Sequence, residues 1–273
     1  MKVRKVKVKD FYIGGGDLVV IGGPCVIESL QLCMEVASFM KEETQKLGIK
    51  YIFKSSFDKA NRSSIKSFRG PGLRKGLKVL EYVREKLDLP VLTDVHCTSQ
   101  VKDVSKVVDI IQIPAFLCRQ TSLVVEAGKT QKVINVKKGQ FLSPQEMRFV
   151  AEKIESVGNF NIIFTERGTF FGYQNLVVDF RSLDIMRSFG YPVIFDATHS
   201  VQRPGAGRYS SAGERKFALP LARASVGFGC DGIFIEVHPH PQKALSDAST
   251  MLDFKMTKRL LSEVKKIWDV VKR

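Results

Sequence analysis

The sequence predicts an α/β protein, a (β/α)8 or TIM barrel with a short N-terminal β extension, because short apolar runs alternate with amphipathic stretches along its 273 residues. Each run is apolar almost throughout, which is typical of a parallel strand buried on both faces. Eight strand–helix units in about 250 residues match the size of such a barrel. We expect strands at 18–21, 51–53, 91–93, 109–113, 133–136, 161–164, 193–195 and 232–235.

Helix signals fill the stretches between these runs. Residues 30–47 carry apolar side chains at the spacing of one helix face. Another helix is expected to begin at Ser143, which suits the N-cap, with Pro144 at the first helical position and Glu146 at the capping-box position. This alternation of strand and helix favours one continuous barrel.

No low-complexity segment or linker divides the chain, so we expect one domain over residues 1–273. The alternation of Val and Lys at positions 6–9 predicts that residues 1–16 form a strand or hairpin that caps the bottom of the barrel. Residues 202–214 follow the seventh expected strand and are rich in Gly and Ser, which favours a mobile loop that can act as a lid.

Composition favours a soluble protein of the cytoplasm. The chain is 44% hydrophobic and 26% charged, and none of its apolar stretches approaches the roughly 18 residues needed to span a membrane. The basic N-terminus lacks the apolar core of a signal peptide. The five cysteines are odd in number and form no CxxC pair, which disfavours a disulfide framework and a zinc finger.

The net charge of +15 admits three interpretations. Excess lysine can lie on a solvated surface, as in the basic C-terminal segment 255–273. Nucleic-acid binding is a second interpretation, but the sequence has no signature of a nucleic-acid-binding fold. The third is an anionic small-molecule substrate, which requires basic residues to converge at one site. We favour the third for a subset of the cations and the first for the remainder, and we expect no nucleic-acid and no membrane partner.

A barrel brings the C-terminal ends of its eight strands to one mouth, where chemistry is expected. Lysine supplies a compact positive charge and arginine a bidentate fork for phosphate or carboxylate. A surface salt bridge is the simpler interpretation of any single cation, but cations at successive strand ends indicate a substrate with several negative charges. The polar or reactive residues at the expected mouth are Cys25, Lys54, Lys59, Arg62, Asp94, His96, Gln112, Lys137, Arg167, His199 and Glu236.

Cys25, His199, Glu236 and Asp247 form a second expected cluster. Thiolate, imidazole and carboxylate together suit a divalent ion such as zinc, iron or manganese. Their spacing along the chain gives no support, and only barrel closure brings the first, seventh and eighth strands side by side. The alternatives are a packed Cys25 thiol, a Cys25 nucleophile activated by His199, and metal ligation by the histidines of the HPHP turn.

Long blocks of the sequence resemble the 3-deoxy-D-manno-octulosonate 8-phosphate synthases, in order from about residue 18 to about residue 250. The blocks are GPCVIES, FKSSFDKANRSSIKSFRGPGL, TDVH, DIIQIPAFLCRQT, NVKKGQF, TERGTFFGYQNLVVDFRSL, FDATHSVQ and EVHPHPQKALSDA. The resemblance implies condensation of phosphoenolpyruvate with D-arabinose 5-phosphate, with release of phosphate, for the sugar core of lipopolysaccharide. Metal-dependent members carry cysteine after the GP of the first block, where metal-independent members carry asparagine. Cys25 therefore resembles the metal-dependent branch.

The resemblance also implies roles for individual residues. The implied metal ligands are Cys25, His199, Glu236 and Asp247. The implied catalytic residues are Cys25, Lys59, Asp94, His96 and His199. The carboxylate end of phosphoenolpyruvate matches Lys54, Ser56, Lys59 and Gln112, and its phosphate matches Lys137, Arg167 and the backbone of Ala115. The arabinose 5-phosphate site matches Asn61, Arg62 and Ser63.

Arg119 matches an arginine that reaches the sugar phosphate in a neighbouring subunit, which implies a homo-oligomer, usually a tetramer in that family. Two departures from the family pattern occur, Ser122 where aspartate is usual and Cys97 where glutamate is usual. The first bears on how Arg119 is held.

The closest alternative is the sister enzyme 3-deoxy-D-arabino-heptulosonate 7-phosphate synthase, which uses erythrose 4-phosphate. Its sugar-phosphate motif resembles KPRTS, whereas residues 59–63 of this chain read KANRS. That difference favours the five-carbon sugar.

Overall fold

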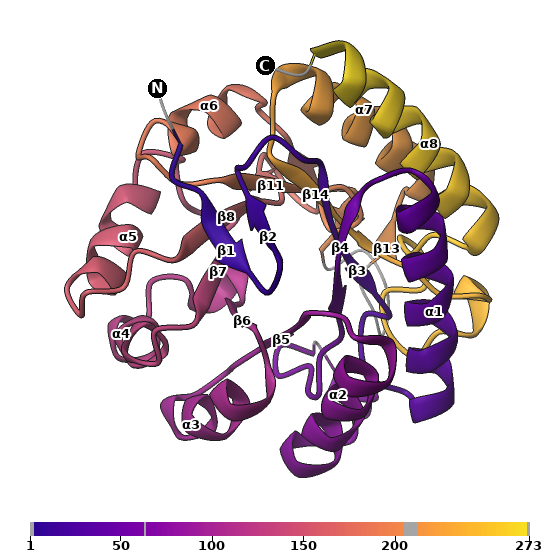
Figure 1. Cartoon of the computed structure of the whole chain (residues 1–273), viewed down its shortest axis with the longest axis horizontal. Coiled ribbons are helices and arrows are strands. Elements are labelled where there is room, and N and C mark those ends of the chain that lie inside the picture. Colours follow the sequence, from indigo (N-terminus) through magenta and orange to yellow (C-terminus); the bar gives the residue numbers. More distant parts are fainter. Residues whose placement is uncertain (1–2, 63, 205–211, 272–273) are drawn as a thin grey trace.

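The structure, a computed structural model, describes residues 3–62, 64–204 and 212–271 and contains a closed barrel of eight parallel strands (Figure 1). Hydrogen-bonded neighbours around the ring follow the order β11-β14-β3-β4-β5-β6-β7-β8. The predicted (β/α)8 barrel and its eight strands are therefore confirmed. The strands are β3 (Val19–Gly23), β4 (Lys50–Lys54), β5 (Val91–Asp94), β6 (Ile110–Ile113), β7 (Val133–Lys137), β8 (Ile162–Glu166), β11 (Val193–Asp196) and β14 (Gly232–Glu236).

Helices surround the barrel as an outer ring (Figure 1). They are α1 (Leu30–Lys46), α2 (Leu73–Leu87), α3 (Thr98–Val107), α4 (Thr121–Lys129), α5 (Met147–Glu155), α6 (Arg181–Arg187), α7 (Ala218–Phe228) and α8 (Phe254–Val271). Their apolar faces pack on the outward-facing strand residues in one continuous core. Short 3-10 helices η1 (Ala115–Leu117), η2 (Arg215–Phe217) and η3 (Pro241–Lys243) lie in the connections. Among the described residues, no helix is both long and apolar enough to cross a bilayer.

The predicted helix at 30–47 is confirmed, whereas the predicted helix start at Ser143 is wrong. The Ser143 backbone N–H does donate to the Glu146 carboxylate at 3.0 Å. The four residues instead form tight turns, since Glu146 N–H bonds to the Ser143 carbonyl and Met147 N–H to the Pro144 carbonyl. Such i to i+3 bonds are wound too tightly for an α-helix, so the regular helix begins at Met147.

An N-terminal hairpin covers one end of the barrel. Strands β1 (Val6–Val8) and β2 (Phe11–Ile13) pair antiparallel, with Val6 opposite Ile13. Their buried side chains join a second apolar cluster inside the barrel, built from positions close to the N-terminal ends of the strands, including Val19, Ile110 and Val133. In Figure 1 the hairpin lies across the barrel opening. The opposite opening, at the C-terminal ends, is left for polar chemistry.

Two smaller hairpins lie beyond the strand ends. Strand β9 (Thr169–Phe170) pairs with β10 (Leu176–Val177) in the connection after β8. Strand β12 (Gln202–Arg203) pairs with β13 (Ala212–Gly213) in the connection after β11. The second hairpin frames the expected lid, but residues 205–211 lie outside the described residues, so the lid stays a prediction.

Candidate active site and metal centre

The strand-end residues converge on one cavity at the C-terminal mouth of the barrel. Strands β4 to β8 and β11, with the loops that follow them, supply its lining. The cavity thus joins predicted substrate-binding and catalytic residues that lie far apart in the sequence. It is lined by Lys54, Lys59, Ala60, Asn61, Asp94, His96, Gln112, Pro114, Ala115, Phe116, Leu117, Lys137, Gln140, Arg167 and His199.

Cys25 is fully buried beside this cavity, just after β3. Gly23 permits this position, because a Cβ atom there would lie only 2.0 Å from the Lys54 carbonyl oxygen. The close approach lets the Lys54 Nζ donate to the Cys25 carbonyl at 2.9 Å. The tight pairing of β3 with β4 therefore places the thiol and the first mouth lysine next to each other.

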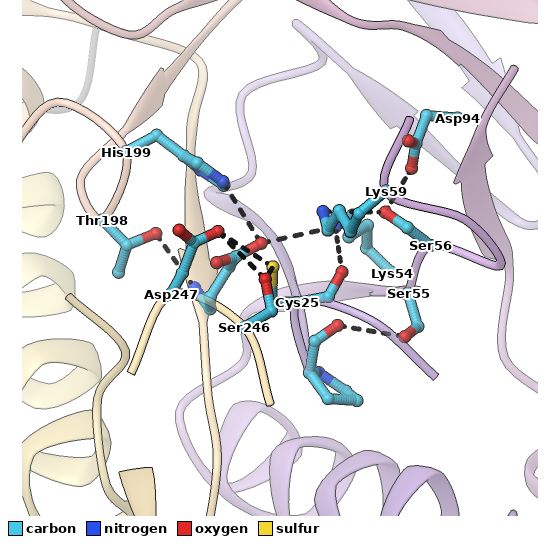
Figure 2. A network of polar contacts seen from close by, with 12 residues as sticks. Cys25, Lys54, Ser55, Ser56, Lys59, Asp94, Thr198, His199, Ser246 and Asp247 are labelled. Atoms are coloured by element: carbon cyan, nitrogen blue, oxygen red, sulfur yellow. Dashed lines mark hydrogen bonds and ion pairs between the residues drawn. The ribbon is translucent and has the colours of Figure 1, made fainter. Parts of the chain in front are cut away.

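Three of the four predicted metal ligands form one buried group. The Sγ of Cys25 and carboxylate oxygens of Glu236 and Asp247 all lie within 4.8 Å of one another. The Cys25 Sγ is 3.0 Å from Asp247 Oδ2 and 2.8 Å from Ser246 Oγ (Figure 2). The backbone of Asp247 has a positive φ of 46°, a conformation that asparagine and aspartate tolerate best and that often marks functional sites.

His199 lies against this group without belonging to it. Its Nε2 is 3.2 Å from Glu236 Oε1 (Figure 2), and its Nδ1 is 2.6 Å from Asp196 Oδ2. The rival histidines of the HPHP turn are likewise outside the group found among the described residues. There, the Nδ1 of His238 accepts the backbone N–H of His240.

The chemical groups of the four predicted ligands fit a divalent cation. The second carboxylate oxygen of Glu236, Oε2, is buried and has no hydrogen-bond partner among the described residues. An unpaired buried carboxylate oxygen is costly, and a bound cation removes that cost. A thiol and two carboxylates beside an imidazole are ligands that zinc, iron and manganese accept.

Burial raises the pKa of the Cys25 thiol well above its usual value, and the negative charges of Asp247 and Glu236 raise it further. A thiol held in its protonated form is a poor nucleophile. The ring nitrogens of His199 contact Asp196 and Glu236, so the imidazole is engaged by carboxylates. The environment therefore suits a thiol that ionises when a cation binds better than it suits a free thiolate nucleophile.

A second polar network joins Lys59, Ser56, Asp94 and His96 (Figure 2 shows the first three). Lys59 Nζ donates to Ser56 Oγ at 3.0 Å, Ser56 donates to Asp94, and His96 Nε2 lies 2.9 Å from Asp94 Oδ2. Burial opposes the charged form of Lys59, but Cys25 and nearby carboxylates outweigh it and raise the lysine pKa. Burial likewise opposes ionised Asp94, but the His96 hydrogen bond and Lys59 hold its pKa below the usual range.

Lys137 and Arg167 lie on the side of the cavity formed by β7 and β8. Burial lowers the pKa of Lys137. The buried ion pair with Asp196 opposes this shift but does not cancel it. Arg167 donates through Nη2 to Gln202 Oε1 at 2.6 Å. Its Nη1 is buried and has no partner among the described residues, so this N–H group is available to an anion.

The predicted sugar-phosphate residues are only partly at the cavity. Asn61 lines it, while Arg62 donates through Nε to the Phe68 carbonyl at 3.1 Å and keeps a buried Nη2 with no partner among the described residues. Ser63 lies outside the described residues. Arg119 is not among the lining residues; its side chain is 64% exposed, and its Nη1 lies 3.6 Å from Glu146 Oε1.

The two departures from the family pattern lie outside the cavity lining. Ser122 is exposed in the first turn of α4, and Cys97 is exposed immediately before α3. The Cys97 Sγ is 3.1 Å from Ser99 Oγ. Neither residue contacts the predicted ligands in the interactions described above.

Sequence reasoning missed several buried residues that hold the mouth together. Asp196 ends β11 and bonds both His199 and Lys137. Glu166 ends β8, and its Oε1 accepts the backbone N–H groups of Arg167 at 3.0 Å and Gly168 at 2.7 Å. Both are acids at the last residue of a strand. That position was the available signal, because strand ends are where the barrel gathers functional groups.

Comparison with known proteins places the chain in a family. A model described as the DAHP synthetase I family matches residues 3–273. The chain is 53% identical over 271 residues to a Fusobacterium nucleatum protein, covering 99% of this chain and 98% of the relative. It is 56% identical over 244 residues to a Cyanothece protein (89% of each) and 48% identical over 272 residues to a Protochlamydia amoebophila protein (99% of each). All three are named 2-dehydro-3-deoxyphosphooctonate aldolase. The chain belongs to the DAHP synthetase I family.

Proposed function

We propose that the protein condenses phosphoenolpyruvate with D-arabinose 5-phosphate and water to give 3-deoxy-D-manno-octulosonate 8-phosphate and phosphate. The observation that carries this proposal is a cation-lined cavity at the mouth of the barrel, beside a buried cluster of Cys25, Glu236 and Asp247. The names of the relatives agree with an eight-carbon product and not with the seven-carbon product of the sister enzyme.

The cavity offers complementary charge for both substrates. We assign the carboxylate end of phosphoenolpyruvate to Lys54, Ser56, Lys59 and Gln112, and its phosphate to Lys137, Arg167 and the Ala115 backbone. The unpartnered Nη1 of Arg167 supports the phosphate assignment. We assign arabinose 5-phosphate to Asn61, Arg62 and Ser63, and the unpartnered Nη2 of Arg62 supports that assignment. Fixed cations that hold two substrates together lower the barrier by orientation and charge stabilisation.

In the reaction, C3 of phosphoenolpyruvate attacks the sugar aldehyde and water adds to C2. The resulting tetrahedral intermediate loses phosphate by C–O cleavage. The raised pKa of Lys59 keeps its positive charge beside the reacting groups. His96 directs one ring nitrogen to Asp94, while its Nδ1 is buried without a partner among the described residues. With the proton on Nε2, the Nδ1 of this lining residue keeps a lone pair that no described residue uses.

A divalent ion, zinc, iron or manganese, is the proposed cofactor, with Cys25, His199, Glu236 and Asp247 as its ligands. The buried, unpartnered Oε2 of Glu236 supports this assignment. When bound, such an ion orients the aldehyde or a water molecule and lowers the pKa of that water.

A homo-oligomer, most simply a tetramer, is the proposed assembly. Arg119 is largely exposed and lies outside the lining of its own cavity, which leaves its guanidinium free to serve a neighbouring subunit. Its single described ion-pair partner, Glu146, is 3.6 Å away and half-exposed. An exposed pair of this kind contributes little stability, so a phosphate of a neighbouring subunit could replace Glu146 at little cost.

Phosphate release with each aldose phosphate tests the proposed substrate. We expect turnover with arabinose 5-phosphate and at least about 100-fold lower kcat/KM with erythrose 4-phosphate, because a site built for hydroxyl hydrogen bonds rejects a sugar that lacks one. Assays without any aldose phosphate supply the background rate. Equal or faster turnover with erythrose 4-phosphate would identify the seven-carbon activity instead.

Replacement of the thiol tests the metal centre. We expect Cys25→Asn to lower zinc affinity by more than about 100-fold, since loss of a ligand costs more than loss of a group that only orients one. Equilibrium dialysis followed by elemental analysis measures this affinity. Cys230→Ala is the matched control, because Cys230 is an equally buried thiol at the opposite end of the barrel. Zinc binding by Cys25→Asn at wild-type affinity contradicts the assignment.

Subunit mixing tests the role of Arg119. Arg119→Ala and Lys137→Met are each expected to be nearly inactive, because each removes a cation from every site. Refolding or exchanging the two together should restore about a quarter of wild-type activity, since that fraction of sites combines an intact cavity with an intact neighbouring arginine. Mixed Lys137→Met and Arg167→Met subunits are the control and should stay inactive. If the mixture of Arg119→Ala and Lys137→Met subunits recovers no activity, a shared site is ruled out. A monomeric protein in light scattering rules it out as well.

A further inference from the structure

Asp196 lies between the proposed metal centre and the proposed phosphate site. It is the last residue of β11 and is fully buried. One of its neighbours is His199, a proposed metal ligand, and another is Lys137, a proposed phosphate ligand. The carboxylate itself is neither a proposed metal ligand nor a proposed substrate ligand.

Both carboxylate oxygens of Asp196 are used. Oδ1 accepts the backbone N–H of His199 at 2.9 Å and both the backbone N–H and the hydroxyl of Thr198 at 3.2 Å. Oδ2 accepts from Lys137 Nζ and lies 2.6 Å from His199 Nδ1. One side chain therefore holds the turn after β11, an imidazole and an ammonium group.

These bonds fix which nitrogen of His199 faces the ligand cluster. Both ring nitrogens face carboxylates, but the contact from Nδ1 to Asp196 Oδ2 is 2.6 Å and that from Nε2 to Glu236 Oε1 is 3.2 Å, so the shorter contact favours the proton of a neutral ring on Nδ1. The lone pair of a neutral ring is then on Nε2, the nitrogen 3.2 Å from Glu236 Oε1. A histidine whose other nitrogen donates to a carboxylate is the usual arrangement of a metal-binding imidazole.

Asp196 also reaches Glu236 through Thr198. The Thr198 hydroxyl donates to Asp196 Oδ1 and accepts the backbone N–H of Glu236 at 3.1 Å. The carboxylate therefore orients one proposed ligand directly and supports the backbone of another.

The other partner of Asp196 is the cation Lys137, whose Nζ also lies 3.3 Å from His199 Nδ1. Lys137 Nζ lies 3.7 Å from the centre of the Phe234 ring and close to the Asp196 carboxylate. The ammonium group is almost completely buried. The Asp196 charge compensates its burial and fixes its position at the cavity wall.

We propose that Asp196 is a positioning residue that ties the metal centre to the phosphate site by orienting His199 Nε2 and Lys137 Nζ with one carboxylate. This inference rests on the proposed function. It goes further by predicting that a single residue, itself neither a metal ligand nor a substrate ligand, sets the affinity of both sites.

The test compares three variants in Co²⁺ binding and in phosphoenolpyruvate kinetics. Metal-stripped protein is titrated with Co²⁺, and the thiolate-to-cobalt absorption band reports binding at Cys25 without any turnover. Asp196→Asn should weaken Co²⁺ binding about 10- to 100-fold and raise the KM for phosphoenolpyruvate about tenfold. The amide nitrogen of the new asparagine would face Lys137 Nζ and His199 Nδ1, both of which donate in the wild-type protein. It would therefore favour the His199 tautomer with the proton on Nε2.

Two controls separate the two effects. Lys137→Met should raise the KM for phosphoenolpyruvate in its residual activity but weaken Co²⁺ binding less than Asp196→Asn does, because Asp196 Oδ2 still accepts from His199 Nδ1 in that variant. Asp231→Asn removes a matched buried carboxylate, because Asp231 pairs with Arg187 and accepts the Val193 N–H at the opposite end of β11. This variant should lose thermal stability and change neither readout.

Each outcome decides the inference. Wild-type Co²⁺ affinity in Asp196→Asn, or an equal loss in Asp231→Asn, overturns it and leaves the proposed function intact. Absence of a thiolate-to-cobalt band in the wild-type protein overturns both.

A second measurement needs no variant, in case Asp196→Asn does not fold. The chain has four histidines, so the ring nitrogens of His199 can be assigned by NMR in zinc-loaded wild-type protein. A proton on Nδ1 supports the inference, and a proton on Nε2 contradicts it.

Discussion

Closure of the parallel barrel is the constraint on which the whole site depends. Hydrogen bonding of β11 to β14 and of β14 to β3 brings residues near 25, 199 and 236 together, although they are spread over most of the chain. The N-terminal hairpin fills the opposite opening with apolar side chains. Polar groups at the C-terminal ends therefore face a cavity that is closed from below, where charge interactions are strong.

That cavity contains more ionisable groups than a buried surface normally tolerates, and mutual compensation makes this possible. Lys54 approaches Glu236, Lys137 approaches Asp196, and Lys59 lies among Cys25 and several carboxylates. Besides His96 Nδ1 and Gln140 Oε1, the charged groups of the proposed site lack a described partner at Glu236 Oε2, Arg167 Nη1 and Arg62 Nη2. A cation at the Glu236 oxygen and a phosphate group at each of the two guanidinium groups would complete the network. The charge of each unpaired group therefore matches the ligand proposed for it.

The sequence predicted the barrel well, because buried parallel strands leave continuous apolar runs, and most of the barrel strands end at a polar residue. Of the five cations expected at the mouth, Lys54, Lys59, Lys137 and Arg167 line one cavity, whereas Arg62 does not. Asp196 and the Thr198 bridge were missed because the contacts from Asp196 to Lys137 and from Thr198 to Glu236 join different strands, and beyond the strand-end position of the acid no local pattern records them. The helix start at Ser143 was wrong for a related reason. The capping contact forms there, but the chain around it follows tight turns that the sequence pattern does not reveal.

Crystallographic location of the metal tests the central claim most directly. Diffraction data from zinc-loaded crystals soaked with phosphoenolpyruvate would be collected above and below the zinc absorption edge. The proposed metal centre requires one strong anomalous peak at about 2.0–2.3 Å from Cys25 Sγ, His199 Nε2 and oxygens of Glu236 and Asp247, with the phosphate of the substrate on Lys137 and Arg167. An anomalous peak at the HPHP turn, or no peak beside Cys25, would contradict it.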